Sequence, residues 1–76
     1  MNITLTTLRA EMPQWIWRAE RKGMGWVYEG RFEERCVRIY QVAVLCGPTD
    51  DDYASVWRVD DGGVSIDYAT FWMRES

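Results

Sequence analysis

The residues best suited to chemistry in this chain are two runs of aspartates. Asp50, Asp51 and Asp52 follow Gly47-Pro48-Thr49, and Asp60 and Asp61 precede Gly62-Gly63. Paired carboxylates can carry out acid–base catalysis, but both runs fall in stretches typical of solvated turns. A calcium loop of the EF-hand type starting at Asp50 would need Gly and Glu where the chain has Ser55 and Asp61. The sequence therefore predicts neither a metal site nor carboxylate catalysis.

Nucleophilic catalysis has equally little support. The chain contains no histidine, which excludes a histidine general base. Cys36 has Arg35 and Arg38 as neighbours, which favours a thiolate, but a cysteine within a strand is more often buried and inert. No glycine-rich phosphate-binding motif is present. We therefore expect a protein that is not an enzyme and holds no cofactor.

The two cysteines also bear on the compartment. Cys36 and Cys46 lie in one run typical of a strand, and ten residues of strand span roughly 33 Å. Because a disulfide needs Cα atoms within about 7 Å, the pair cannot form a bridge along a continuous strand. The sequence thus favours a reducing environment.

The helices and strands that position these residues are expected to form one domain covering residues 1–76. A chain this short has a marginal core, and its five Trp, four Tyr and two Phe offer large rings to fill it. Thr4 is a suitable N-cap for a short helix, Ile3 and Leu8 have the spacing of a hydrophobic staple, and Pro13 ends the helix.

After Pro13 the apolar period changes to two, which is typical of strands. We expect strands near 15–20, 26–29, 36–46, 53–59 and 64–68, separated by turns at 22–25, 30–35, 47–52 and 60–63. Residues 69–76 fit either a helix or a strand. The predicted fold class is α+β, with the short N-terminal helix packed on a four- to five-stranded antiparallel meander.

Charge is distributed unevenly between the two halves. Residues 1–46 carry seven basic and five acidic residues, whereas residues 47–76 carry two basic and seven acidic ones. Nucleic-acid-binding domains normally show a basic footprint, so the acidic half favours a basic protein partner over direct nucleic-acid contact.

The chain shows no sign of membrane insertion or export. No apolar run approaches the roughly 20 residues of a membrane span, and Met1 to Met12 lack the layout of a signal peptide. We expect a soluble, cytoplasmic protein that does not contact membranes.

In its length, absence of enzyme motifs, acidic turns, dense aromatics and helix-plus-meander pattern, the chain resembles the anti-CRISPR proteins of bacteriophages and mobile elements. The resemblance implies an inhibitor in the host cytoplasm. Its partner would be a basic, nucleic-acid-binding CRISPR effector, whose access to target DNA it would block. Under this hypothesis the partner-binding residues are the acidic residues of the two turns and the aromatic residues of the strand between them: Asp50, Asp51, Asp52, Tyr53, Trp57, Asp60 and Asp61. The two acidic turns would lie about 20 Å apart, at opposite ends of that strand.

Two alternatives remain open. One is a small phage structural or assembly protein that acts as a homo-oligomer through a sheet edge or face. The other is a single-stranded nucleic-acid-binding protein, which would stack bases and contact phosphates on a sheet. The residues for that role are basic or aromatic: Arg18, Arg38 and Tyr40 on the first three strands, with Arg21 and Lys22 at the first turn.

Overall fold

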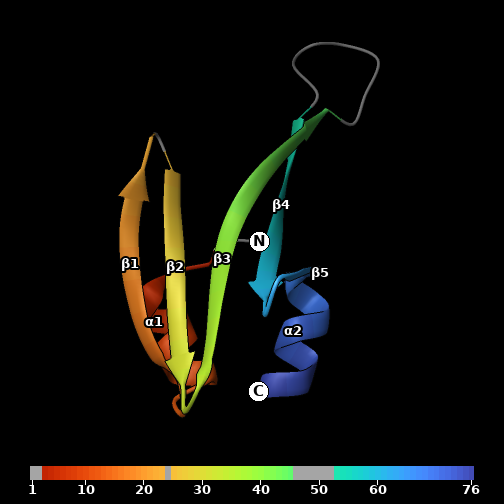
Figure 1. Cartoon of the computed structure of the whole chain (residues 1–76). Helices are drawn as coiled ribbons and strands as arrows, with labels where there is room; N and C mark the ends of the chain where they lie inside the picture. The colour runs from red at the N-terminus through yellow and green to blue at the C-terminus, as the bar shows by residue number, and fades with distance from the viewer. Residues whose placement is uncertain (1–2, 24, 46–52) are drawn as a thin grey trace.

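The computed structural model of the protein describes residues 3–23, 25–45 and 53–76, with the backbone alone at 43–45 and 53–55. One helix, α1 (Leu5–Glu11), precedes five antiparallel strands, and a second helix ends the chain. The strands are β1 (Ile16–Lys22), β2 (Gly25–Phe32), β3 (Arg35–Leu45), β4 (Tyr53–Asp61) and β5 (Val64–Asp67). They form one sheet in the order β1-β2-β3-β4-β5 (Figure 1). The predicted α+β meander is confirmed.

Helix α1 begins as the sequence predicts. The Thr4 hydroxyl accepts a hydrogen bond from the Thr7 backbone N–H, and the Thr7 hydroxyl accepts one from the Thr4 N–H, which completes a capping box. Leu8 and Met12 are fully buried and Ile3 nearly so. The helix thus anchors the N-terminal end of the chain on the sheet.

The C-terminal segment, which the apolar pattern leaves open, is a helix: α2 (Tyr68–Glu75). Asp67 is its N-cap and accepts hydrogen bonds from the backbone N–H and the hydroxyl of Thr70. These bonds lower the pKa of Asp67 below its ordinary value. Tyr68, predicted to extend the last strand, instead begins this helix and is buried with Phe71.

Both helices cover the same face of the sheet. The core joins Leu8, Met12 and Phe71 from the helices to Val37, Ile39 and other side chains of the strands. Trp72 Nε1 donates to the Glu11 carboxylate at 2.8 Å, which ties α2 to α1. The other face of the sheet has no helix over it in the part of the chain that the structure describes. We call these the covered face and the open face.

One predicted turn is wrong. Residues 30–35 were expected to form a long polar turn, but β2 continues to Phe32 and the turn contains only Glu33 and Glu34. Gly30 is buried in the strand because the Trp17 ring lies directly over it. A similar difference occurs at 60–63, where Asp60 and Asp61 end β4, and Gly62 and Gly63 alone form the turn with positive φ angles.

Candidate functional site

The open face carries charged side chains in rows that run across the strands. One row contains Arg18, Glu29, Arg38, Asp60 and Ser65, each directly opposite the next in the sheet register. Basic and acidic residues alternate along this row, and opposite charges placed directly across neighbouring strands attract. A face of this kind has little net charge but a defined pattern of positive and negative sites.

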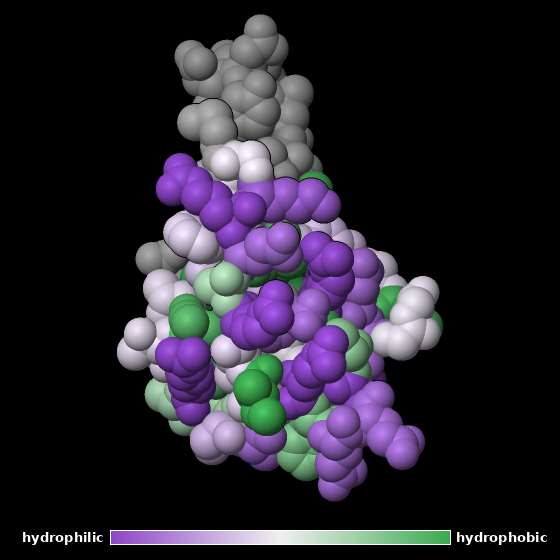
Figure 2. All heavy atoms as spheres, turned by 60° about the vertical axis from the view of Figure 1, so that its left-hand side comes forward, coloured by the Kyte–Doolittle hydropathy of each residue, from purple (hydrophilic) through white to green (hydrophobic). Residues whose placement is uncertain are grey.

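A neighbouring row is more mixed. It contains Glu20, Val27, Tyr40, Arg58 and Asp67. The Tyr40 hydroxyl donates to Asp60 Oδ1 at 3.3 Å, and Arg58 donates to the hydroxyl and carbonyl oxygens of Ser65. Figure 2 shows the side of the molecule that carries β1, where most of the surface is hydrophilic with isolated hydrophobic residues among it.

The nucleic-acid alternative depends on basic and aromatic residues that share one face. The sheet register places four of them on the open face: Arg18, Lys22, Arg38 and Tyr40. Arg21 does not: it lies on the covered face, with its guanidinium 5.8 Å from the centre of the Trp26 ring. A hollow of about 460 Å³ is lined by Lys22, Arg38, Tyr40, Gln41 and Asp60. We call it the outer hollow. Three of the predicted residues, Lys22, Arg38 and Tyr40, therefore come together there, but Asp60 lies among them.

The predicted acidic site is only partly within the described residues. Asp50, Asp51 and Asp52 lie outside them, and at Tyr53 the structure describes the backbone alone. Asp60 is exposed on the open face, opposite Arg38. Tyr53 and Asp61 lie at opposite ends of β4. The sequence predicts that its two acidic turns flank this strand in the same way.

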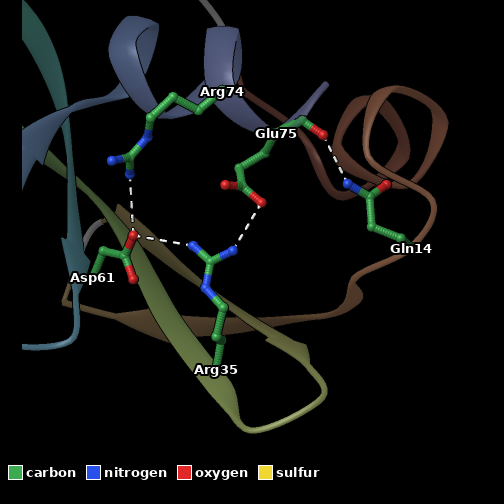
Figure 3. Close-up of polar contacts among 5 residues, drawn as sticks. All are labelled: Gln14, Arg35, Asp61, Arg74 and Glu75. Carbon is green, nitrogen blue, oxygen red and sulfur yellow. Dashed lines mark hydrogen bonds and ion pairs between the residues drawn. The ribbon is translucent and has the colours of Figure 1, made fainter.

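Asp61 is already paired within the molecule. Its Oδ2 accepts from Arg35 at 3.2 Å and from Arg74 at 3.1 Å (Figure 3). Arg35 also donates to Glu75 Oε1 at 3.1 Å, and this bond is the main reason why the pKa of Arg35 is raised. The Glu75 carbonyl accepts from Gln14 at 2.7 Å. Asp61 thus joins the sheet to α2, a structural role that its position before Gly62 did not predict.

Trp57 is buried on the covered face, with its ring 6.0 Å from that of Tyr28. It still contributes to a second hollow, of about 270 Å³, on that face. This inner hollow is lined by Ile3, Thr4, Gly25, Trp26, Tyr28, Gln41 and Trp57. Trp26 is the exposed aromatic of the group, at 46%. The alternation in the sequence predicts that Trp26 and Tyr28 share one face of the sheet. It does not predict a hollow between these rings and β4.

Other candidate chemistry can be assigned briefly. Cys36 is a free thiol and is exposed, in contrast to the buried position expected for a strand cysteine. Among the residues that the structure describes, no three His, Cys, Asp or Glu side chains are grouped as metal ligands. The described helices α1 and α2, of seven and eight residues, are too short to span a membrane. No protein-family model, curated protein or solved structure matches the chain.

Proposed function

We propose that the chain is a non-enzymatic protein-binding module, an inhibitor of the anti-CRISPR type, and that it docks through the open face of its sheet. The observation that carries the proposal is the row Arg18, Glu29, Arg38 and Asp60, whose charges alternate across four strands on a face without a helix over it. Alternating charge provides recognition by complementarity, which fixes the register and the choice of a protein partner.

The same pattern makes nucleic acid a weaker candidate for this face. A phosphate backbone is bound by clustered positive charge, whereas each arginine of the row has an acidic residue directly opposite it. Asp60 also lines the outer hollow with Lys22 and Arg38. A protein partner, by contrast, can present basic and acidic side chains in the complementary pattern.

The acidic residues that remain available contribute to the same proposal. Asp60 presents its carboxylate on the open face, and Asp50, Asp51 and Asp52 add negative charge directly before Tyr53 in the sequence. Carboxylates at these positions can occupy sites where a basic partner otherwise holds phosphates.

The test is capture of purified CRISPR effector complexes by the tagged chain at physiological salt. We expect stoichiometric binding of an effector and competition with its target DNA. The double variant Arg18→Glu/Arg38→Glu should weaken binding at least tenfold, because it places like charges opposite Glu29 and Asp60 and removes the alternation. Arg9→Glu, on the exposed surface of α1, is the matched control and should bind as the unaltered chain does.

Two results would overturn the proposal. A chain that captures no effector and elutes as a homo-oligomer would support the structural or assembly role instead. A chain that binds single-stranded oligonucleotides with salt-dependent quenching of tryptophan fluorescence would support the nucleic-acid alternative. Full binding by the Asp50/Asp51/Asp52→Asn triple variant and by the Asp60/Asp61→Asn variant would exclude phosphate mimicry by the aspartates.

A further inference from the structure

The pairing between β2 and β3 stops before β3 ends. The last register pair of these strands is Val27 with Tyr40. Beyond it, Gln41 to Leu45 have register partners on β4 alone among the described residues, from Trp57 back to Tyr53. Figure 1 shows β3 curving away from β2 at this end while staying beside β4. The two strands therefore open into a fork, and β3 has an edge there that no described residue pairs with.

The hairpin turns fix which backbone groups face this edge. In antiparallel pairs, the two residues that flank a two-residue turn are hydrogen-bonded to each other, and hydrogen-bonded pairs then alternate along the strands. Phe32 and Arg35 flank such a turn, so the odd-numbered residues of β3 direct their N–H and C=O groups toward the β2 side. The turn between Asp61 and Val64 leads to the same assignment through β4. Ala43 and Leu45 thus present donors and acceptors to the open fork.

The two hollows lie on opposite faces of the sheet at this fork, and Gln41 lines both. The inner hollow has three aromatic rings, those of Trp26, Tyr28 and Trp57. The outer hollow has Lys22 and Arg38 against one carboxylate, that of Asp60, which already accepts from Tyr40. One hollow therefore suits an apolar side chain, and the other suits an anionic one.

From this arrangement we infer that the edge of β3 from Gln41 to Leu45 receives an extended peptide segment of the partner as an added strand. Successive side chains of a strand point to opposite faces. An added segment would therefore place an aromatic or large apolar side chain in the inner hollow and an acidic neighbour near Lys22 and Arg38. Main-chain hydrogen bonds would provide the affinity and the two hollows the specificity, as in other cases of strand addition.

A partner segment that contains acidic residues matches the charge at the fork better than a second copy of the same edge does. The sequence from Gln41 to Leu45 is Gln-Val-Ala-Val-Leu, which contains no acidic residue to place near Lys22 and Arg38. Self-pairing of this edge would add no negative charge to the outer hollow, where Lys22 and Arg38 face the single carboxylate of Asp60. The inference rests on the proposed function in one respect only, namely that the partner is a protein.

The direct test uses synthetic peptides and the ¹⁵N-labelled full chain, observed by NMR. The probe is an acetylated, amidated octapeptide that alternates Phe or Val with Glu. We expect saturable shifts at the amides of Ala43 and Leu45 and at the Trp26 and Trp57 indoles. The same peptide with Lys in place of each Glu should bind at least tenfold more weakly, because Lys22 and Arg38 repel it.

Backbone methylation separates strand addition from simple side-chain contact. A peptide N-methylated at the amides that face β3 should lose binding at least tenfold, whereas methylation of the alternate amides should change it little. Lys22→Glu should weaken binding of the Glu peptide about tenfold, and Arg9→Glu, a charge reversal on the exposed surface of α1 and outside the outer hollow, should not. Equal binding of both methylated peptides, or shifts confined to residues outside the fork, would overturn the inference.

The variant Ala43→Pro connects this test to the whole partner. Proline removes the N–H that faces the fork, and it is tolerated where that N–H points away from a ladder. If the effector binds the unaltered chain and Ala43→Pro binds equally well, strand addition is wrong while the proposed function stands. If the peptide binds with the expected pattern and no effector does, strand addition stands and the proposed partner class is wrong.

Discussion

At one end of the sheet, where β2 turns into β3, both helices lie close to the strands, and charged residues connect β3, β4 and α2. At the other end, β3 continues beside β4 without β2, and Val42 there is exposed. The same strand is thus a core strand over its first half and an edge strand over its second. The difference separates the buried core of this small chain from the edge that we propose as the site of strand addition.

Burial follows this division within single strands. Val37 and Ile39 of β3 are fully buried, whereas Val42 of the same strand is 37% exposed. On β4, Val59 is fully buried and Val56 is 37% exposed. An apolar pair left on the open face near the fork adds little to stability, and it is available for contact with a partner.

The largest effect is expected for Gly30→Ala. A Cβ atom at Gly30 would lie 2.4 Å from Trp17 Cζ3, and the Trp17 ring is itself buried and held by a hydrogen bond from Nε1 to the Met12 carbonyl. Because the ring has little room to move, we expect a loss of about 3 kcal/mol in the free energy of unfolding. Urea denaturation followed by tryptophan fluorescence measures it.

Gly25→Ala is the matched control at the open end of β2. A Cβ atom there would approach only the Lys22 carbonyl, at 4.0 Å, so we expect a change of less than about 1 kcal/mol. Equal losses for the two variants would show that β2 is packed equally tightly at both ends. That result would contradict the difference between the closed and the open end of the sheet.

The second prediction compares two valines on β3. Val37→Ala removes buried methyl groups and leaves a cavity beneath the helices, so it should cost about 2 to 3 kcal/mol in the free energy of unfolding. Val42→Ala should cost less than about 1 kcal/mol, since its side chain is 37% exposed. A larger loss at Val42 than at Val37 would mean that the outer half of β3 is covered in solution.

How far the sequence predicts this division can be judged from single residues. Thr4, Gly62 and Gly63 have local signals that are independent of the rest of the fold, and the predicted cap and turn were found there. Gly30 resembles a turn residue locally, but its place in β2 is decided by Trp17 on another strand. Local chemistry could not supply that contact.

The candidate site was less predictable than the fold. The sequence grouped Arg18, Arg38 and Tyr40 with Arg21 and Lys22, and the structure places all of these except Arg21 on one face. The fork depends on where β3 bends away from β2, and the pairing of Asp61 with two arginines depends on where α2 ends. Both are consequences of tertiary packing, so no spacing in the sequence reveals them.

A third prediction concerns alkaline pH. Burial, with a smaller contribution from the negative charge of Glu11, raises the pKa of Tyr68 from 10.0 to about 12. The contribution of buried Tyr68 to the free energy of unfolding is fully present below pH 10, because the phenol is then neutral in both the folded and the unfolded chain. It is lost as the pH rises through 12, since the unfolded chain ionises first. We expect a decrease on the order of 2 kcal/mol in the free energy of unfolding over this window.

Urea denaturation between pH 9 and 12 measures this decrease, and Tyr68→Phe should remove much of it. If the unaltered chain and Tyr68→Phe lose stability equally as the pH rises, groups other than Tyr68 cause the alkaline transition. The result would also test whether α2 closes the covered face as tightly in solution as its buried Tyr68 and Phe71 indicate.

The smallest effect is expected for the charged residues at the closed end. Arg35 contacts Asp61 and Glu75, and its guanidinium lies 4.9 Å from the centre of the Trp15 ring. Because its side chain is 42% exposed, water and salt screen these contacts, and Arg35→Ala should cost about 1 kcal/mol. Urea denaturation at low and high salt measures the loss, which should shrink as salt increases.

Arg31→Ala is the control, because among the described residues Arg31 pairs with Glu29 alone, on its own strand, and is 71% exposed. It should leave stability nearly unchanged at either salt concentration. Arg35 connects three elements at the closed end, so its loss should also increase hydrogen exchange in α2, whereas the amides of Val42 and Val44, which face β4, should exchange at unaltered rates. Equal acceleration at the fork would show that the two ends of β3 open together, and then stability and recognition would not be separable in this chain.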